Sequence, residues 1–262
     1  MVKNNCVVYY SCCLLFFLSL FMGCIPASLL TKSANLTPPE QKDCKNPDII
    51  TAIKGRDDYL MSLKATAQIK IKPEKGGELA VRALIMLKRP DQLRVEIFGP
   101  ANQTVALVVY NGGELSFLSF QENKLYKDYP FPMDVSKLPN YLLGLPVSGG
   151  QGSEGSGWYK KPDMFPGSCI YINSENEQIS ITNEGTISDI MLQGDGNRQI
   201  QVTISSYKDI NGFIFPFAIS IDNGLANLSI KYRDVELNPD ISDNSFALPQ
   251  MPGEEAIPIP TR

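Results

Sequence analysis

The chain has 262 residues and is acidic, with 24 Lys and Arg against 28 Asp and Glu, and it contains no histidine. The acidic balance argues against a nucleic-acid partner, because phosphate binding needs a basic face. Without histidine, Ser-His-Asp and Cys-His catalysis and histidine metal clusters are excluded, and no spacing of Asp and Glu singles out a carboxylate pair, so we expect no enzyme, metal or cofactor.

The N-terminal segment has the layout of a bacterial export signal. Lys3 precedes an apolar run from about residue 12 to 22, which is too short for a membrane span of about 20 apolar residues. The run ends in Gly23-Cys24, which resembles the lipobox of bacterial lipoproteins, where the cysteine is diacylated and becomes the mature N-terminus. We predict a signal peptide over 1–23 and a membrane anchor on Cys24. The alternative is a secreted protein cut nearby, with Cys24 as an ordinary thiol.

Cleavage after residue 23 leaves Cys24, Cys44 and Cys169 of the six cysteines. If Cys24 carries lipid, Cys44 and Cys169 are the remaining pair, and an exported, oxidising location favours a disulfide between them. The alternative is two unpaired buried thiols. Two thiols without histidine are a poor structural zinc site, which needs about four nitrogen or sulfur ligands.

Residues 24–47 predict a flexible tether, because they are rich in Ser, Thr, Asn and Pro and lack periodicity. Residues 48–63 follow with apolar side chains at helical spacing and Pro47 at the start, which predicts an amphipathic helix. Gly55 weakens the middle of this helix. The folded domain therefore begins near residue 48.

From Lys64 the apolar residues alternate with polar ones. The predicted strands are 64–72, 78–88, 92–99, 103–110, 114–120 and 123–129. Short strands joined by tight turns indicate an antiparallel meander. Leu93, Val95 and Ile97 share one face of their strand, so one side of this sheet is expected to be apolar.

Residues 134–145 return to helical spacing, interrupted by Pro139 and closed by Gly144, and predict a short, broken helix over the sheet. A flexible glycine-rich loop over 147–157 follows. Alternation then resumes, and further strands are predicted at 168–173, 177–182, 186–193, 199–207, 215–222 and 227–237. A sheet of about eleven or twelve strands cannot stay flat, so a curved half-barrel or a barrel is expected.

This order of elements resembles the LolA/LolB superfamily of lipoprotein-localisation factors. Residues 88–113 are similar to a family stretch in which a Leu-Arg strand runs through a Gly-Pro turn into a Thr-bearing strand. "NYLLGLP" at 140–146 resembles the family's helix end, and 241–259 resembles its closing strand, in which an acidic-polar turn is followed by Phe-x-Leu and a proline. The resemblance covers about residues 48–250, followed by a tail at 251–262. It implies a mainly β fold: a curved antiparallel sheet forming an unclosed β-barrel of about 11 strands, with helices as a lid over an apolar cavity.

The resemblance also implies a function. It points to a LolB-like lipoprotein of the outer membrane, facing the periplasm, that accepts lipoproteins from a LolA-like periplasmic carrier by binding their acyl chains. In that group a loop between two strands carries a protruding apolar residue for membrane insertion, and the matching segment here contains Phe98, Pro100 and Ala101. Ala101 stands at the position of the protruding residue, and an alanine side chain buries too little area to act as a wedge. Either Phe98 takes over this role, or the protein binds lipid without inserting cargo into the membrane.

The candidate cavity-lining side chains are apolar residues of the strands and the lid. They are Ile69, Ile71, Leu84, Met86, Leu93, Val95, Ile97, Val105, Leu107, Leu115, Phe117 and Leu142. The alternative is a dry core, and alternation alone does not reveal which face is concave. Arg94 is a candidate structural residue that could bond the lid backbone or an anionic group; its alternative is a solvated charge.

Two other functions stay open from the sequence. One is a non-catalytic scaffold or accessory lipoprotein of an envelope complex, whose cavity is filled by its own side chains. The other is an enzyme with paired carboxylates, which predicts a polar cleft and a raised carboxyl pKa. The identity of the cargo, whether lipoprotein, phospholipid or another amphiphile, does not follow from the residues.

Overall fold

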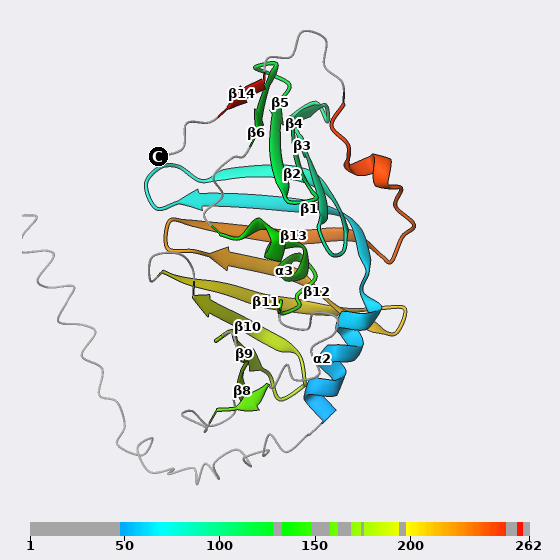
Figure 1. Cartoon of the computed structure of the whole chain (residues 1–262), viewed down its shortest axis with the longest axis vertical. Coiled ribbons are helices and arrows are strands. Elements are labelled where there is room, and N and C mark those ends of the chain that lie inside the picture. The colour runs from blue at the N-terminus through cyan, green and yellow to red at the C-terminus, as the bar shows by residue number, and fades with distance from the viewer. Residues whose placement is uncertain are drawn as a thin grey trace, which may run out of the picture. The chain divides into compact units, whose positions relative to one another are not determined.

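The computed structural model of the chain describes residues 48–127, 133–147, 158–161, 169–173, 176–193, 198–249 and 256–258 (Figure 1). The predicted signal peptide, the anchor at Cys24 and the tether with Cys44 lie outside these residues. Of the predicted tail at 251–262, only 256–258 is described. All of the described residues belong to one compact unit.

The described helices are short. Helix α2 spans Asp48–Tyr59, and α3 spans Leu138–Leu142 directly after the 3-10 turn η3 at Val135–Lys137. A further 3-10 turn, η5, spans Asp243–Phe246. The predicted helices at 48–63 and 134–145 are thus confirmed in place. The first one ends at Tyr59 because the chain enters strand β1 at Ser62.

The strands make up most of the described chain. They are β1 (Ser62–Pro73), β2 (Leu79–Lys88), β3 (Gln92–Phe98), β4 (Thr104–Asn111), β5 (Glu114–Ser119), β6 (Lys124–Lys127), β7 (Tyr159–Lys160), β8 (Cys169–Ile172), β9 (Gln178–Ile181), β10 (Ile187–Gln193), β11 (Gln199–Ile210), β12 (Phe213–Asp222), β13 (Ala226–Leu237) and β14 (Ala256–Pro258). Each of the twelve predicted strands is present. The short strands β7 and β14 were not predicted.

All of these strands belong to one sheet, ordered β14-β6-β5-β4-β3-β2-β1-β13-β12-β11-β10-β9-β8-β7. Neighbours pair antiparallel, except that β14 runs parallel to β6. The sheet does not close, and Figure 1 shows that it twists between its two ends, so that β3–β6 run in a different direction from β11–β13. The prediction of a mainly β, curved and unclosed antiparallel sheet is confirmed. The count of about 11 strands was too low.

Within 241–259 the expected acidic-polar turn is present, but residues 246–248 after it do not form a strand. Residues 243–246 form η5, and the strand at the end of the sheet is β14, which pairs with β6 through Ala256 and Leu125. Side chains on the outside of the sheet hold the segment around η5: the Lys88 ammonium lies 2.6 Å from Asp243 Oδ1, and Arg94 donates to the Ser245 carbonyl at 3.1 Å. These contacts place the segment across the strands rather than beside them.

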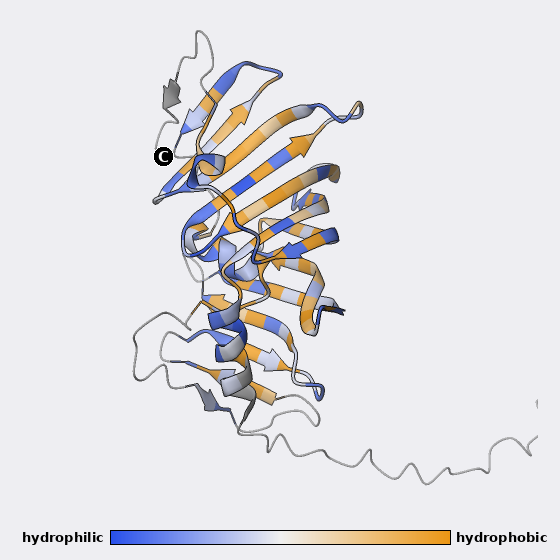
Figure 2. Ribbon diagram, turned by 90° about the vertical axis from the view of Figure 1, so that its right-hand side faces the viewer, coloured by the Kyte–Doolittle hydropathy of each residue, from blue (hydrophilic) through white to orange (hydrophobic). Residues whose placement is uncertain are grey.

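The pairing register assigns each side chain to one of two faces. We call the face that carries Leu63, Ala65, Ile85 and Leu93 the inner face, because its buried side chains join those of α2 and α3 in one core cluster. The opposite, outer face carries a smaller cluster of Leu107, Val109, Leu118 and Leu125, packed against Phe120 and Leu248. Figure 2 shows hydrophobic residues recurring along the strands. Both faces of β4–β6 are therefore partly apolar.

Candidate functional site

Helix α3 and the turn after it are packed into the inner face. Residues 141–146 are all buried, and the Tyr232 hydroxyl on β13 donates to the Leu142 carbonyl at 2.8 Å. Gly144 has φ +68°, and a Cβ added there would lie 2.7 Å from Pro216 Cγ of β12. Burial raises the pKa of the Tyr232 hydroxyl well above its usual range, so Tyr232 remains a donor at physiological pH. The α3 segment is therefore a fixed part of the inner-face core.

Helix α2 rests on the inner face through aromatic and cationic contacts as well as apolar ones. Ile53 belongs to the core, and the Tyr59 ring stacks on Phe213 at 4.9 Å. The Arg56 guanidinium lies 5.6 Å from the ring centre of Tyr207 and 5.5 Å from that of Phe213. Such cation–π contacts are worth about 0.5–2 kcal/mol, more when the cation is desolvated.

Arg56 is poorly provided with hydrogen bonds for a buried cation. Its Nε and Nη2 atoms are buried and have no hydrogen-bond partner in the described part of the chain. Desolvation by burial lowers the pKa of Arg56, an effect that the neighbouring Tyr207 hydroxyl partly opposes. Burial raises the pKa of Tyr207 to about 12, and its hydroxyl donates to the Ile187 carbonyl at 2.6 Å.

A buried ion pair joins the C-terminal end of α2 to the turn after β2. Arg89 Nη2 lies 2.7 Å from Asp57 Oδ1, with side chains 15% and 9% exposed. Arg89 Nη1 also donates to the carbonyls of Asp57 at 2.6 Å and Leu60 at 3.3 Å. Burial raises the pKa of the Asp57 carboxyl, and the positive charge of Arg89 opposes that rise. Sequence reasoning missed this pair, because nothing in the local pattern links residues 57 and 89.

The predicted cavity residues do not share one face. The register places Ile69, Ile71, Leu93, Val95, Ile97, Leu115 and Phe117 on the inner face, and Leu142 lies there on α3. Leu84, Met86 and Leu107 point to the outer face, because Leu84 and Leu107 lie opposite Glu96 and Met86 lies opposite Arg94, while Val105 has no partner at the β-bulge of β4. The predicted set therefore cannot line one cavity on the inner face, since Leu84, Met86 and Leu107 lie on the other side of the sheet.

The inner face is not uniformly covered. Leu93, Tyr110 and Leu142 are buried, whereas Val95 and Val108, which lie opposite each other on β3 and β4, are only half-buried. The other half-buried apolar side chains on the inner face of β1–β5 are Ile71, Val81, Ile97 and Phe117. At the edge of this region Leu79, opposite Ile71, is 55% exposed. A partly accessible apolar strip therefore runs over the inner face of β1–β5. We call it the inner strip, and its residues are Ile71, Leu79, Val81, Val95, Ile97, Val108 and Phe117.

The predicted membrane-insertion segment is the turn between β3 and β4. The Gly99 amide donates to the Gln103 carbonyl at 2.8 Å and the Asn102 amide to the Gly99 carbonyl at 3.0 Å. Pro100 and Ala101 are exposed, and Phe98 is half-buried. A Cβ on Gly99 would lie 2.8 Å from both Gln103 Nε2 and Val105 Cγ1, so the turn is closely packed. The structure thus presents Pro100 and Ala101 at the tip of a tight turn.

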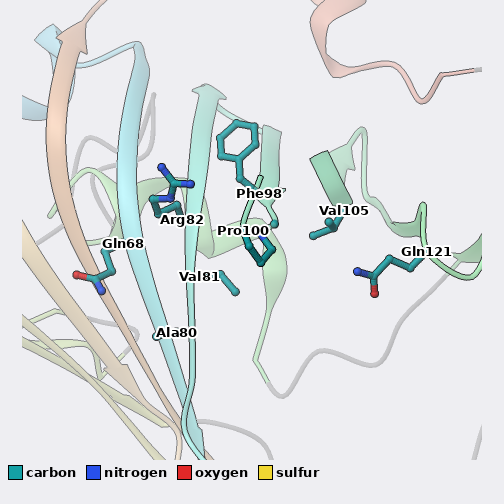
Figure 3. A pocket seen from close by; sticks show the side chains of 9 residues that line it. Gln68, Ala80, Val81, Arg82, Phe98, Pro100, Val105 and Gln121 are labelled. Carbon is teal, nitrogen blue, oxygen red and sulfur yellow. The ribbon is translucent and has the colours of Figure 1, made fainter. Parts of the chain in front are cut away.

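A pocket of about 370 Å³ lies beside this turn (Figure 3). It is lined by Gln68, Ala80, Val81, Arg82, Phe98, Gly99, Pro100, Val105 and Gln121. Two residues of the predicted insertion segment, Phe98 and Pro100, are part of its wall. The pocket itself was not predicted, because its lining comes from four strands and two turns that are distant in the sequence.

Arg94 serves as a structural clamp on the outer face. It pairs with Glu96 at 2.8 Å and donates to the carbonyls of Ser245 and Ala247 at 3.1 and 3.2 Å. The backbone it holds is the C-terminal segment around η5 rather than a lid helix. Cys169 is buried and disulfide-bonded. Since Cys44 lies outside the described residues, the pairing with Cys44 stays a prediction.

Within the described ranges, no group of three or more His, Cys, Asp or Glu side chains could hold a metal ion. In the same part of the chain, no helix combines the length and apolar character needed to cross a membrane. The inner strip concentrates apolar surface, and such a surface can bind a hydrocarbon chain by removing it from water.

No protein-family model matches the sequence, and no curated protein is similar to it. Solved structures do match the fold. A LolA superfamily protein from Nitrosomonas europaea has a TM-score of 0.52 at 12% identity, covering 76% of this chain and 97% of that one. A DUF1329 family protein from Desulfovibrio piger has a TM-score of 0.52 at 10% identity, covering 76% and 95%. The fold of this chain is therefore LolA-like.

Proposed function

We propose that the protein is a lipid-anchored envelope protein that binds acyl chains on its inner strip and accepts lipoproteins from a LolA-like periplasmic carrier for outer-membrane localisation. The observation that carries the proposal is the half-buried apolar strip of β1–β5, which lies beside the buried inner-face core that α2 and α3 join. The LolA-like fold and the predicted anchor at Cys24 support the same function.

The energetics favour a binding protein without catalysis. Each methylene that leaves water contributes about 0.8 kcal/mol, so an ordinary acyl chain laid along the strip supplies enough free energy for capture. No catalytic residue is needed, and specificity for the chain would be loose. We therefore propose that recognition of the cargo depends on its acyl group rather than on its polypeptide.

The strip predicts which side chains the acyl chain touches. Val95 lies on the inner face of β3, and Leu84 lies on the outer face of the neighbouring β2. Both are half-buried apolar residues, so replacement by serine removes similar apolar area from each. Val95→Ser is expected to weaken acyl capture, and Leu84→Ser is the matched control that should leave it unchanged.

The test is a transfer assay with the full-length protein in vesicles and a carrier loaded with a lipoprotein whose acyl chain carries a photoreactive group. Illumination should cross-link the acyl chain to β2–β5, and mass spectrometry should find the sites on the inner strip. Cargo without acyl chains is the control for polypeptide contact. A folded protein that shows no acyl-dependent cross-link would contradict the proposal and favour the scaffold function.

A further inference from the structure

The pocket beside the β3–β4 turn has one cationic side chain in its lining, Arg82. Arg82 lies on the outer face of β2, opposite Gln68 on β1 and Phe98 on β3. In the described part of the chain, Arg82 makes no ion pair, whereas Arg89 pairs with Asp57 at 2.7 Å and Arg94 with Glu96 at 2.8 Å. No acidic residue lines the pocket. The positive charge of Arg82 is therefore available to a ligand in the pocket.

The other lining groups suit an anion with an apolar attachment. The primary amides of Gln68 and Gln121 are hydrogen-bond donors, and Phe98, Pro100 and Val105 form an apolar wall. Figure 3 shows Arg82 beside Phe98, with Gln121 reaching in from the opposite side. A guanidinium with nearby amide donors is a favourable arrangement for phosphate, because its fork of N–H groups matches phosphate oxygens.

The position of the pocket restricts the source of such an anion. Pro100 belongs to its wall and is also exposed at the tip of the turn next to Ala101. A ligand that enters beside this apolar tip therefore meets an aromatic ring, a cation and amides within one small space. The volume of about 370 Å³ is at the lower end of the range for small-molecule sites, and it is suited to a headgroup rather than to two acyl chains.

We propose that this pocket binds the phosphate of a phospholipid headgroup, with Arg82 as its cationic partner, when the β3–β4 turn meets the membrane surface. Phe98 and Pro100 then contact the glycerol end of the lipid, and Ala101 rests at the surface without acting as a wedge. The inference rests on the proposed function only in placing this turn at a membrane. It assigns headgroup recognition to this pocket and acyl-chain binding to the inner strip, two sites that share the side chain of Val81.

The test uses the full-length protein in nonionic detergent and three probes studied by isothermal titration calorimetry. These are dihexanoylphosphatidylglycerol below its micelle concentration, dihexanoylglycerol with the same chains and no phosphate, and inorganic phosphate. The variants are Arg82→Gln, Arg82→Lys and Lys231→Gln. Lys231 lies opposite Gln68 on the same outer face but does not line the pocket, so Lys231→Gln is the matched loss of one charge.

We expect the phospholipid to bind most tightly, and Arg82→Gln to weaken it by about tenfold or more, because a charged hydrogen-bonding partner is lost. Arg82→Lys should recover part of the affinity, and Lys231→Gln should bind as the parent chain does. Equal binding of dihexanoylglycerol, or an Arg82→Gln variant that binds normally, would overturn the inference. Inorganic phosphate that binds as tightly as the phospholipid would overturn the lipid source and indicate a site for the free ion.

The two proposals can fail separately. Normal acyl cross-linking together with a phospholipid affinity that is unchanged in Arg82→Gln would refute the headgroup site alone. Loss of acyl cross-linking together with phospholipid binding that depends on Arg82 would refute the acyl-binding function alone. Circular dichroism melting of each variant checks its fold, and the exposed position of Arg82 predicts an unchanged melting temperature.

Discussion

Gly144 offers a direct test of how tightly the α3 segment is seated. Its φ of +68° lies in the left-handed region, and a Cβ at this position would meet Pro216 Cγ at 2.7 Å and Ile204 Cγ2 at 3.5 Å. Both neighbours belong to strands β11 and β12 of the inner face. Gly144→Ala therefore adds a strained backbone and a steric overlap at the same time.

The two costs can be separated with a second glycine. An L-residue in the left-handed region costs about 1–2 kcal/mol, and overpacking a filled core costs about 1–3 kcal/mol more. Gly185 has a similar φ of +81° but open space around its Cβ position. We expect Gly185→Ala to lose about 1–2 kcal/mol of unfolding free energy from backbone strain. For Gly144→Ala we expect a loss of about 2–5 kcal/mol, the sum of strain and overlap.

Urea unfolding followed by circular dichroism measures both losses on the same scale, provided that the slope of free energy against urea is unchanged. A larger loss for Gly144→Ala than for Gly185→Ala supports a fixed α3 segment. Equal losses would refute the reasoning, because they would mean that Pro216 and α3 move apart without resistance.

Three further results are expected. Arg89→Met should cost about 3 kcal/mol of unfolding free energy at pH 7, because it leaves the Asp57 carboxylate buried without its partner; urea unfolding measures the loss, and a change below about 1 kcal/mol would contradict it. The pKa of Asp57 is raised in the folded state, so protonation of this carboxyl stabilises the fold. The contribution of the protonated carboxyl to the unfolding free energy is fully present below pH 3.8 and is lost as pH rises through the raised pKa. Asp57→Asn should therefore gain stability relative to the parent chain as pH increases across that window. Arg94→Met should release the segment around η5, seen as faster proteolysis near residues 243–247, and Lys88→Met, which removes a more exposed ion pair with Asp243, should have the smaller effect.

The strands were predictable because their signal is local. Alternation over residues 64–72 or 199–207 reflects one buried and one exposed face, and each such run became a strand of the sheet. The segment at 241–249 failed for the opposite reason. Its conformation is set by Lys88 and Arg94, which are about 150 residues away in the chain, and no local pattern records those contacts.

The assignment of faces could not be made from the sequence in β2–β5. Leu107 and Leu118 are buried on the outer face, and Leu93 and Leu115 on the inner face, because separate clusters cover the two sides. Alternation disappears as a guide when both sides are apolar. The three residues that lie on the outer face, Leu84, Met86 and Leu107, all belong to β2 or β4, where this ambiguity applies.

The distribution of burial decides where an acyl chain can bind without unfolding part of the core. Leu142 is 2% exposed, and its carbonyl accepts the Tyr232 hydroxyl, so contact with this side chain would require α3 to leave the sheet. That movement would break a buried hydrogen bond, with a cost of about 1–3 kcal/mol for the group left unsatisfied, and expose several fully buried residues. Val95 and Val108, which lie opposite each other, are partly accessible to solvent as they stand. Binding on β3 and β4 therefore gains the free energy of burying hydrocarbon without this opposing cost, which favours the inner strip over the space beneath α3.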